Sequence, residues 1–138
     1  MPRAQRRAAA TSAVSMLPPA QAAAANEAFK VILDEPWRID KVNANGKQFI
    51  DGLKSAGFDT LLTTTAIVPV LCGSDERAYE LTQACQHKDL FVLPVVSPAV
   101  PEGFARLRAT VTAAHEPEEI NYALGVIEKA GREIGIIQ

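Results

Sequence analysis

The 138-residue sequence has only two cysteines, Cys72 and Cys85, and neither stands in the short paired spacing that holds zinc. So few cysteines cannot build a disulfide framework, so we expect two half-buried free thiols, a reducing cytoplasmic setting and no metal site. No segment reaches the ~18 consecutive apolar residues of a membrane span, and no span is predicted.

Several motifs that mark active sites are also missing. The sequence has no glycine-rich phosphate loop, no GxSxG, no HExxH and no Cys–His arrangement typical of catalysis. None of its lysines follows an apolar strand in a loop of small residues, where a desolvated Schiff-base lysine is expected. All six lie on predicted helices or helix ends: Lys30, Lys41, Lys47, Lys54, Lys88 and Lys129. We therefore predict no complete active site and no catalytic residue in this chain alone.

The composition is that of a globular domain, with 48% hydrophobic and 22% charged residues. Three of the 14 basic residues lie within the first seven positions, and the remainder of the chain carries 11 basic and 16 acidic residues, which argues against nucleic-acid binding. Residues 1–17 lack the continuous apolar stretch of a signal peptide and are interpreted as a disordered or extended arm. Residues 18–138 are expected to form a single domain.

Helices are predicted from proline, cap and periodicity signals. Pro18 and Pro19 precede an alanine-rich run that predicts a helix over about 19–34. Apolar residues spaced by three and four predict a second helix, from about residue 39 to a C-terminal glycine at Gly57. Ser74 is expected to cap a third helix that ends near His87, and Pro117 to open the last one.

Three apolar or alternating segments predict strands. Residues 66–72 form a β-branched run whose Pro69 indicates an edge strand, because proline cannot donate to a ladder. Residues 90–96 are a second apolar strand. Residues 105–111 alternate between small or apolar and polar side chains, which predicts a half-buried strand. The expected fold is an α+β two-layer sandwich with a small, mainly antiparallel sheet covered by helices.

Two arginines and a histidine are the candidate functional residues. Arg106 and Arg108 share the polar face of the 105–111 strand, a rigid support for binding a carboxylate or phosphate with planar guanidinium groups. The alternative is that both pair with nearby acids, and Glu102 is the expected partner of Arg106. Arg108 is expected to lie further inside. His115, at the junction of strand and helix, can enter a site or satisfy a backbone group.

Four segments in order resemble the C-terminal part of the α-oxoamine synthases. These are Ser15-Met-Leu-Pro-Pro-Ala-Gln21, Ile67-Val-Pro-Val70, Phe91-Val-Leu-Pro-Val-Val-Ser-Pro-Ala-Val-Pro101 and Ala105-Arg-Leu-Arg-Ala-Thr-Val-Thr-Ala-Ala-His115. Members of that family are fold-type I pyridoxal-phosphate enzymes that condense an amino acid with an acyl thioester and release CO₂. The resemblance covers about residues 12–137 and implies a homodimer whose sites lie at the subunit interface.

The resemblance assigns roles to individual residues. Arg108 corresponds to the arginine that holds the amino-acid carboxylate. The family's loop over the acyl substrate corresponds to Ser97, Pro98, Ala99, Val100 and Pro101. A hydroxyl before Leu-Pro-Pro reaches the cofactor phosphate of the neighbouring subunit. Ungapped alignment puts Val14 at that position, and a small shift brings Ser15 or Ser12 there, so Ser15 is the cofactor-binding candidate. His115 is a candidate for a supporting role behind the site.

The family's cofactor-stacking histidine, pyridine-nitrogen aspartate and Schiff-base lysine have no counterpart here. The chain is therefore expected to be one domain of such an enzyme, or a gene fragment, inactive alone and without bound pyridoxal phosphate. The alternatives are a stand-alone module that binds a carboxylate ligand or a partner protein, and the C-terminal domain of a class I/II aminotransferase. A missing cofactor domain also predicts self-association through the helix at residues 20–33.

Overall fold

A computed structural model describes residues 18–138. The chain divides into two compact units after Pro36, so that α2 (Pro19–Asp34) belongs to the first and residues Trp37–Gln138 form the second. The sequence pattern predicts an arm over residues 1–17 and a single α+β domain over residues 18–138. Ser15, the candidate from the resemblance, lies outside the described residues.

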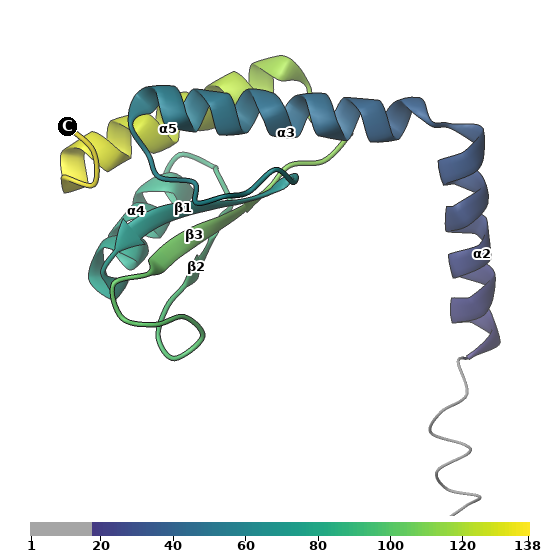
Figure 1. The fold of residues 1–138 in the computed structure, drawn as a ribbon, viewed down its shortest axis with the longest axis horizontal. Coiled ribbons are helices and arrows are strands. Elements are labelled where there is room, and N and C mark those ends of the chain that lie inside the picture. Colours follow the sequence, from purple (N-terminus) through teal and green to yellow (C-terminus); the bar gives the residue numbers. More distant parts are fainter. Residues whose placement is uncertain (1–17) are drawn as a thin grey trace, which may run out of the picture. The chain divides into compact units, whose positions relative to one another are not determined.

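The first unit contains the alanine-rich helix α2, whose predicted limits are confirmed (Figure 1). Pro18 occupies the N-cap and Pro19 the first helical turn, where a missing N–H costs no hydrogen bond. The helix ends at Asp34, just before the Glu35-Pro36 pair, because the residue that precedes a proline is disfavoured in the helical region. None of its residues is buried.

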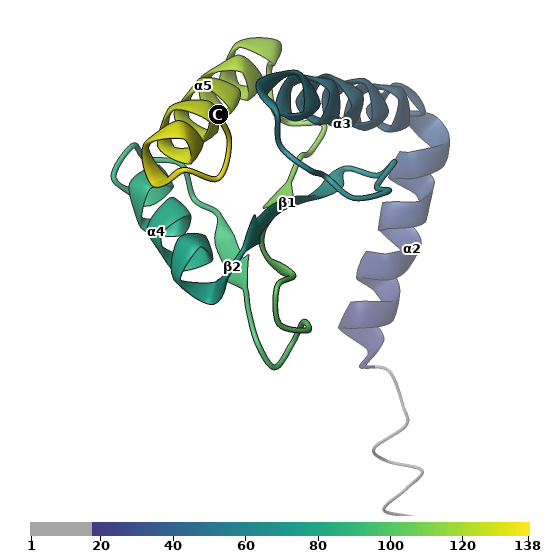
Figure 2. The ribbon, with the colours of Figure 1, turned by 60° about the vertical axis from the view of Figure 1, so that its left-hand side comes forward.

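The second unit is an α+β two-layer sandwich, as predicted. Its elements in chain order are α3 (Trp37–Ala56), β1 (Ile67–Gly73), α4 (Asp75–Gln86), β2 (Leu93–Val95), β3 (Ala105–Thr110) and α5 (Pro117–Ile134). The sheet is antiparallel with the order β1-β3-β2, so β3 is central and β1 is the edge strand that Pro69 predicted. Helices α3, α4 and α5 cover one face of it (Figures 1 and 2).

The core lies between the sheet and the three helices. Each long strand buries every second residue: Val68, Val70 and Cys72 on β1, and Ala105, Leu107 and Ala109 on β3. The helices meet this surface with Phe49, Ile50 and Leu53 from α3, Ala78, Leu81 and Cys85 from α4, and Ile120 and Ile127 from α5. Within residues 37–138, no helix covers the other face of the sheet.

Two features of this unit differ from the sequence predictions. Strand β2 spans only residues 93–95, because its pairing with β3 stops at Leu93 opposite Arg108 and residues 90–92 run free of the ladder. Both thiols are fully buried instead of half-buried, with 3% of Cys72 and none of Cys85 exposed. Cys72 lies on the core face of β1, and Cys85 lies on the buried side of α4.

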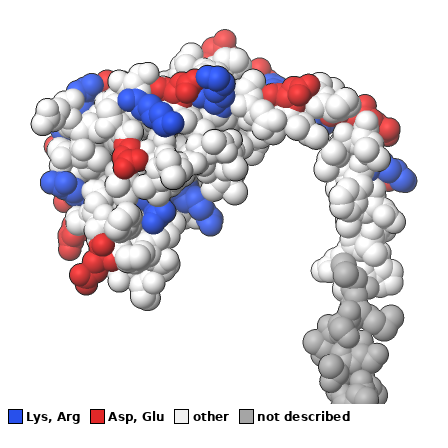
Figure 3. Space-filling model, in the orientation of Figure 1, with Lys and Arg blue, Asp and Glu red and all other residues white. Residues whose placement is uncertain are grey.

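Within residues 18–138, no helix has the length and apolar character needed to cross a bilayer. Basic and acidic side chains are interspersed over the face of the second unit drawn in Figure 3. That face therefore lacks the single-sign surface on which nucleic-acid binding depends.

Candidate functional site

The candidate site is the uncovered face of the sheet, along the central strand β3. Arg106, Arg108 and Thr110 point to this face, because Ala105, Leu107 and Ala109 alternate with them and face the core. On the neighbouring strands, the residues in register with these three are Leu71, Pro69 and Ile67 of β1, and Val95 and Leu93 of β2. The two guanidinium groups therefore stand on a rigid, otherwise mainly apolar surface.

Arg108 is the basic residue on this face that has no internal partner. It is exposed and lies opposite Pro69 on one side and Leu93 on the other, neither of which can accept a side-chain hydrogen bond. Within residues 18–138 its guanidinium group forms no hydrogen bond or ion pair. An exposed guanidinium without an internal partner can offer its planar donors to an anion from outside the domain.

Arg106 is placed differently from the sequence prediction. It is half-buried, whereas Arg108 is exposed, so the expected order of depth is reversed. Its Nε donates to the carbonyl oxygen of Phe104 at 3.0 Å, and no ion pair with Glu102 is formed. Arg106 is half-buried because it lies opposite Val95, next to the loop that joins β2 to β3. The Arg106 side chain folds back onto this loop.

The proline-rich loop, residues 97–101, connects β2 to β3 at the Arg106 end of the sheet. It starts at the N-terminus of α4, where the backbone N–H of Ser97 donates to Oδ1 of Asp75 at 3.4 Å. The Ser97-Pro98 peptide bond is cis. Ser97, Pro98, Ala99 and Pro101 are exposed and Val100 is half-buried, so the loop offers most of its surface to other groups.

His115 lies at the opposite end of β3 from this loop. Its Nδ1 accepts a hydrogen bond from the backbone N–H of Thr112 at 3.2 Å, so the neutral ring carries its proton on Nε2. The half-buried ring lines a cavity of about 560 Å³ between β3, α5 and residues 89–92, to which Arg108 contributes nothing. The structure therefore does not bring His115 and Arg108 into one site.

Asn45 is a structural determinant of this region that the sequence analysis missed. Only 4% exposed, it donates from Nδ2 to the carbonyl oxygens of Thr112, at 3.0 Å, and His115, at 2.9 Å. Lys41, one turn earlier on α3, pairs with Glu116 at 2.6 Å. An amide among the buried residues of a helix was the available signal, because such a group needs partners.

The six lysines lie on the surface or pair with an acid. All six are in the described part of the chain, and five are exposed. The sixth, Lys41, is committed to Glu116. None lines the cavity beside His115. The described residues also contain no group of three His, Cys, Asp or Glu side chains that could hold a metal ion.

Comparisons of the sequence and of the structure with known proteins match this chain to related enzymes. The family described as aminotransferase class I and II matches residues 3–127. An 8-amino-7-oxononanoate synthase of Symbiobacterium thermophilum is 39% identical over 120 residues, which is 87% of this chain and 31% of that protein. The Thermus thermophilus protein named 8-amino-7-oxononanoate synthase/2-amino-3-ketobutyrate coenzyme A ligase is 38% identical over 121 residues, again covering 31% of its length.

Among solved structures, serine palmitoyltransferase from S. paucimobilis is similar, with a TM-score of 0.81 and 31% sequence identity. The match covers 89% of this chain and 31% of that one. An 8-amino-7-oxononanoate synthase from Francisella tularensis, at 18% identity and a TM-score of 0.72, shares the fold. The chain thus spans about a third of the length of these relatives.

Proposed function

Because the chain belongs to the aminotransferase class I and II family and matches its α-oxoamine synthase members, we propose that it is the substrate-carboxylate domain of such an enzyme. The reaction of the whole enzyme would be the decarboxylative condensation of an amino acid with an acyl thioester. The domain's own part is to bind and orient the amino acid, and the isolated chain is inactive. Arg108 carries this role.

The observation that supports the proposal is the unpaired, exposed guanidinium of Arg108 on the central strand. Backbone pairing on both sides of β3 fixes the position of the Arg108 backbone and the face of the sheet to which its side chain points. A carboxylate bound by two parallel N–H···O bonds is fixed in orientation as well as position. The bond at the amino acid's α-carbon that must break can thus be held in a productive orientation.

Loop residues 97–101 and His115 have separate roles in this proposal. The exposed loop at the Arg106 end would cover the acyl substrate, as the resemblance implies. His115 would stabilise the turn after β3, since Nδ1 is already occupied by the Thr112 N–H. Ser15 stays the candidate for the cofactor phosphate of a neighbouring subunit.

Pyridoxal phosphate, the cofactor of this family, supplies the electron sink for such chemistry when it is bound. The residues described here do not fit the covalent attachment of that group, because every lysine is either exposed or paired with an acid. A desolvated lysine is what a Schiff base at neutral pH requires. The proposal therefore assigns cofactor attachment to residues outside this chain.

The test is a chimera in which this chain replaces the matching third of the Symbiobacterium thermophilum synthase. Release of coenzyme A from acyl-CoA in the presence of the amino acid measures the condensation. Arg108→Lys should raise the KM for the amino acid by about ten- to hundredfold, since hydrogen bonds to charged groups contribute about 1.5–3 kcal/mol and lysine lacks the planar fork. Arg106→Lys, the matched control, should change it by less than about threefold.

Equal KM values for the two variants would contradict the role of Arg108. The chain alone, mixed with pyridoxal phosphate and gel-filtered, should show no aldimine absorbance, and a stoichiometric borohydride-trapped adduct on one lysine would contradict the cofactor assignment. Tight binding of an amino acid or acyl compound by the chain alone would instead support a stand-alone binding module.

A further inference from the structure

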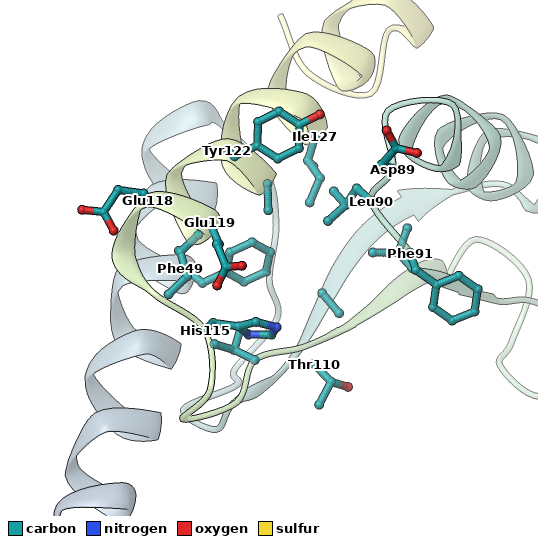
Figure 4. A pocket seen from close by; sticks show the side chains of 15 residues that line it. Phe49, Asp89, Leu90, Phe91, Thr110, His115, Glu118, Glu119, Tyr122 and Ile127 are labelled. Carbon is teal, nitrogen blue, oxygen red and sulfur yellow. The ribbon is translucent and has the colours of Figure 1, made fainter.

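The sheet opens into a cavity where β2 and β3 stop pairing. Continuing the register of Leu93 with Arg108 would place residues 90–92 opposite residues 109–111, but the two segments separate there. The N–H of Val111 donates to the carbonyl oxygen of Ala66 on the β1 side, so the N–H and C=O of the adjacent Thr110 point to the other side, into the gap. Both separated segments line the cavity of about 560 Å³ (Figure 4).

The interior of this cavity is apolar. Its lining includes core residues that are at most 6% exposed: Phe49, Val92, Ala109, Val111, Ile120 and Ile127. Leu90, Phe91 and Ala123 add further apolar groups to the lining. A volume of several hundred Å³ with a predominantly apolar lining is typical of a small-molecule site, and filling it removes apolar surface from water.

The carboxylates are the charged side chains around the cavity that have a fixed sign. Glu119 and Asp89 lie on opposite sides of it, and Glu118 lies at the outer edge (Figure 4). No lysine or arginine is among the lining residues. Nδ1 of His115, another lining residue, accepts the backbone N–H of Thr112 and is not free to bind a ligand. The field of this opening therefore favours a cation.

We propose that this cavity binds a small molecule with an apolar body and a positively charged amine group. The apolar part occupies the space between Phe49, Ile120 and Ile127, and the ammonium lies near Glu119. One oxygen of Glu119 accepts the backbone N–H of Glu116 at 2.8 Å, which holds the carboxylate in place and leaves its other oxygen for the ligand. The backbone carbonyl of Thr110 offers a further acceptor.

This site is independent of the proposed function. Arg108 does not line the cavity, and it recognises an anion, whereas the cavity favours a cation. Failure of amine binding would leave the carboxylate role of Arg108 untouched, and failure of the Arg108 test would leave the cavity untouched.

The experiment is a titration of the full chain with three probes that share one apolar body: hexylammonium, hexanol and hexanoate. Chemical shifts of labelled backbone amides follow binding. Hexylammonium should bind with 1:1 stoichiometry and shift residues 90–92 and 109–111, and its Kd should be at least about tenfold lower than that of hexanoate. Equal affinity for the three probes, or shifts confined to other residues, would overturn the proposal.

Two variants locate the ligand. Ala123→Phe fills the cavity and should abolish binding, whereas Ala114→Phe, at an exposed position outside it, should have no effect. Glu119→Gln removes the charge but keeps an oxygen that can accept the Glu116 N–H, so it should weaken hexylammonium by about three- to tenfold without changing hexanol. Because this variant preserves the cap, it keeps the test decisive if Ala123→Phe does not fold. Unchanged hexylammonium affinity in Glu119→Gln would refute the ammonium site.

Discussion

Asn45 shows how one buried amide can hold two segments that are far apart in the sequence. Its Nδ2 reaches from α3 to the carbonyl oxygens of Thr112 and His115, which bracket the turn between β3 and α5. Gln48, one turn further along α3, reaches the carbonyl oxygen of Pro117 at 3.3 Å and Oδ1 of Asn121 at 2.9 Å. The direction in which α5 leaves the sheet therefore depends on side chains of α3.

Replacement of Asn45 by alanine should lower the free energy of unfolding by about 1–3 kcal/mol, because two carbonyl groups lose their donor. Urea denaturation followed by circular dichroism measures the change. Asn43→Ala, at an exposed position of the same helix, is the matched control and should change stability by less than about 0.5 kcal/mol. Equal losses of stability in the two variants would show that the hydrogen bonds of the Asn45 side chain do not stabilise the fold.

Burial suppresses the reactivity of the two cysteine thiols. Desolvation raises the pKa of the Cys72 thiol to about 11, opposed by a hydrogen bond with the backbone of Leu107. Burial also raises the pKa of Cys85 to about 11, with a contribution from the nearby charge of Cys72. The thiolate is the reactive form, so both groups should be inert in the folded protein at pH 8.

Alkylation at pH 8 should therefore be slow in buffer and rapid in urea, with mass spectrometry counting the modified thiols. Stability should fall as the pH rises from 9 toward 11, because the unfolded thiols ionise near 9.0 while the folded ones stay protonated. Cys85→Ala should make this fall shallower. Rapid labelling of the folded chain at pH 8 would contradict the burial of the thiols.

At the scale of elements, α5 joins the layers of the sandwich, since it packs on both α3 and α4. Its glycines differ in their surroundings. A Cβ on Gly131 would lie 2.3 Å from Cζ of Phe58, a ring that is only 4% exposed. A Cβ on Gly125 would meet no atom within 4 Å. Only Gly131 therefore permits the close approach of the helix to this ring.

Alanine at these two positions should have opposite effects. Gly131→Ala should destabilise by about 1–3 kcal/mol, because the buried ring must move in a packed core. Gly125→Ala should stabilise by about 0.5–1 kcal/mol, because alanine is the better helix former and space is open. Thermal unfolding of both variants beside the parent measures the difference. A stable Gly131→Ala protein would mean that Phe58 has room to move.

Large apolar side chains of α2 are exposed to solvent. In α2, Phe29 is 66% and Leu33 78% exposed, on a helix without a buried residue. The chain also covers only about a third of its relatives' length. Apolar patches of this kind in soluble proteins mark interaction sites. We therefore expect the chain to associate with itself through α2 when no other partner is present.

Sedimentation velocity at several concentrations should show association that strengthens with concentration. Leu33→Gln should weaken it several-fold, since it removes the most exposed of the large apolar side chains of α2. Leu62→Gln is the matched control, because Leu62 is 99% exposed but lies outside that helix. A strictly monomeric chain at high concentration would contradict the prediction, as would equal effects of the two variants.

Local signals in the sequence were sufficient to predict the helices, the strands and the fold class. The proline pair opened α2 at the expected residue, Ser74 caps α4 by accepting the N–H of Arg77, and Gly57 follows α3 with a φ of 101°. Each of these features involves residues within a few positions of one another. The alternation along β3 also identified its core face, because the period of two belongs to the strand itself.

Contacts between segments that are distant in the sequence determine the depth of the two arginines, the length of β2 and the partners of His115 and Asn45. The order of depth of Arg106 and Arg108 was wrong, because it depends on how the hairpin closes around β3. The early end of β2 depends on its register with β3. Packing of α5 turned His115 into a cavity away from Arg108, and only the position of α3 gives Asn45 its partners. A sequence pattern carries the preferences of each segment, whereas register and packing arise from the free energy of all segments together.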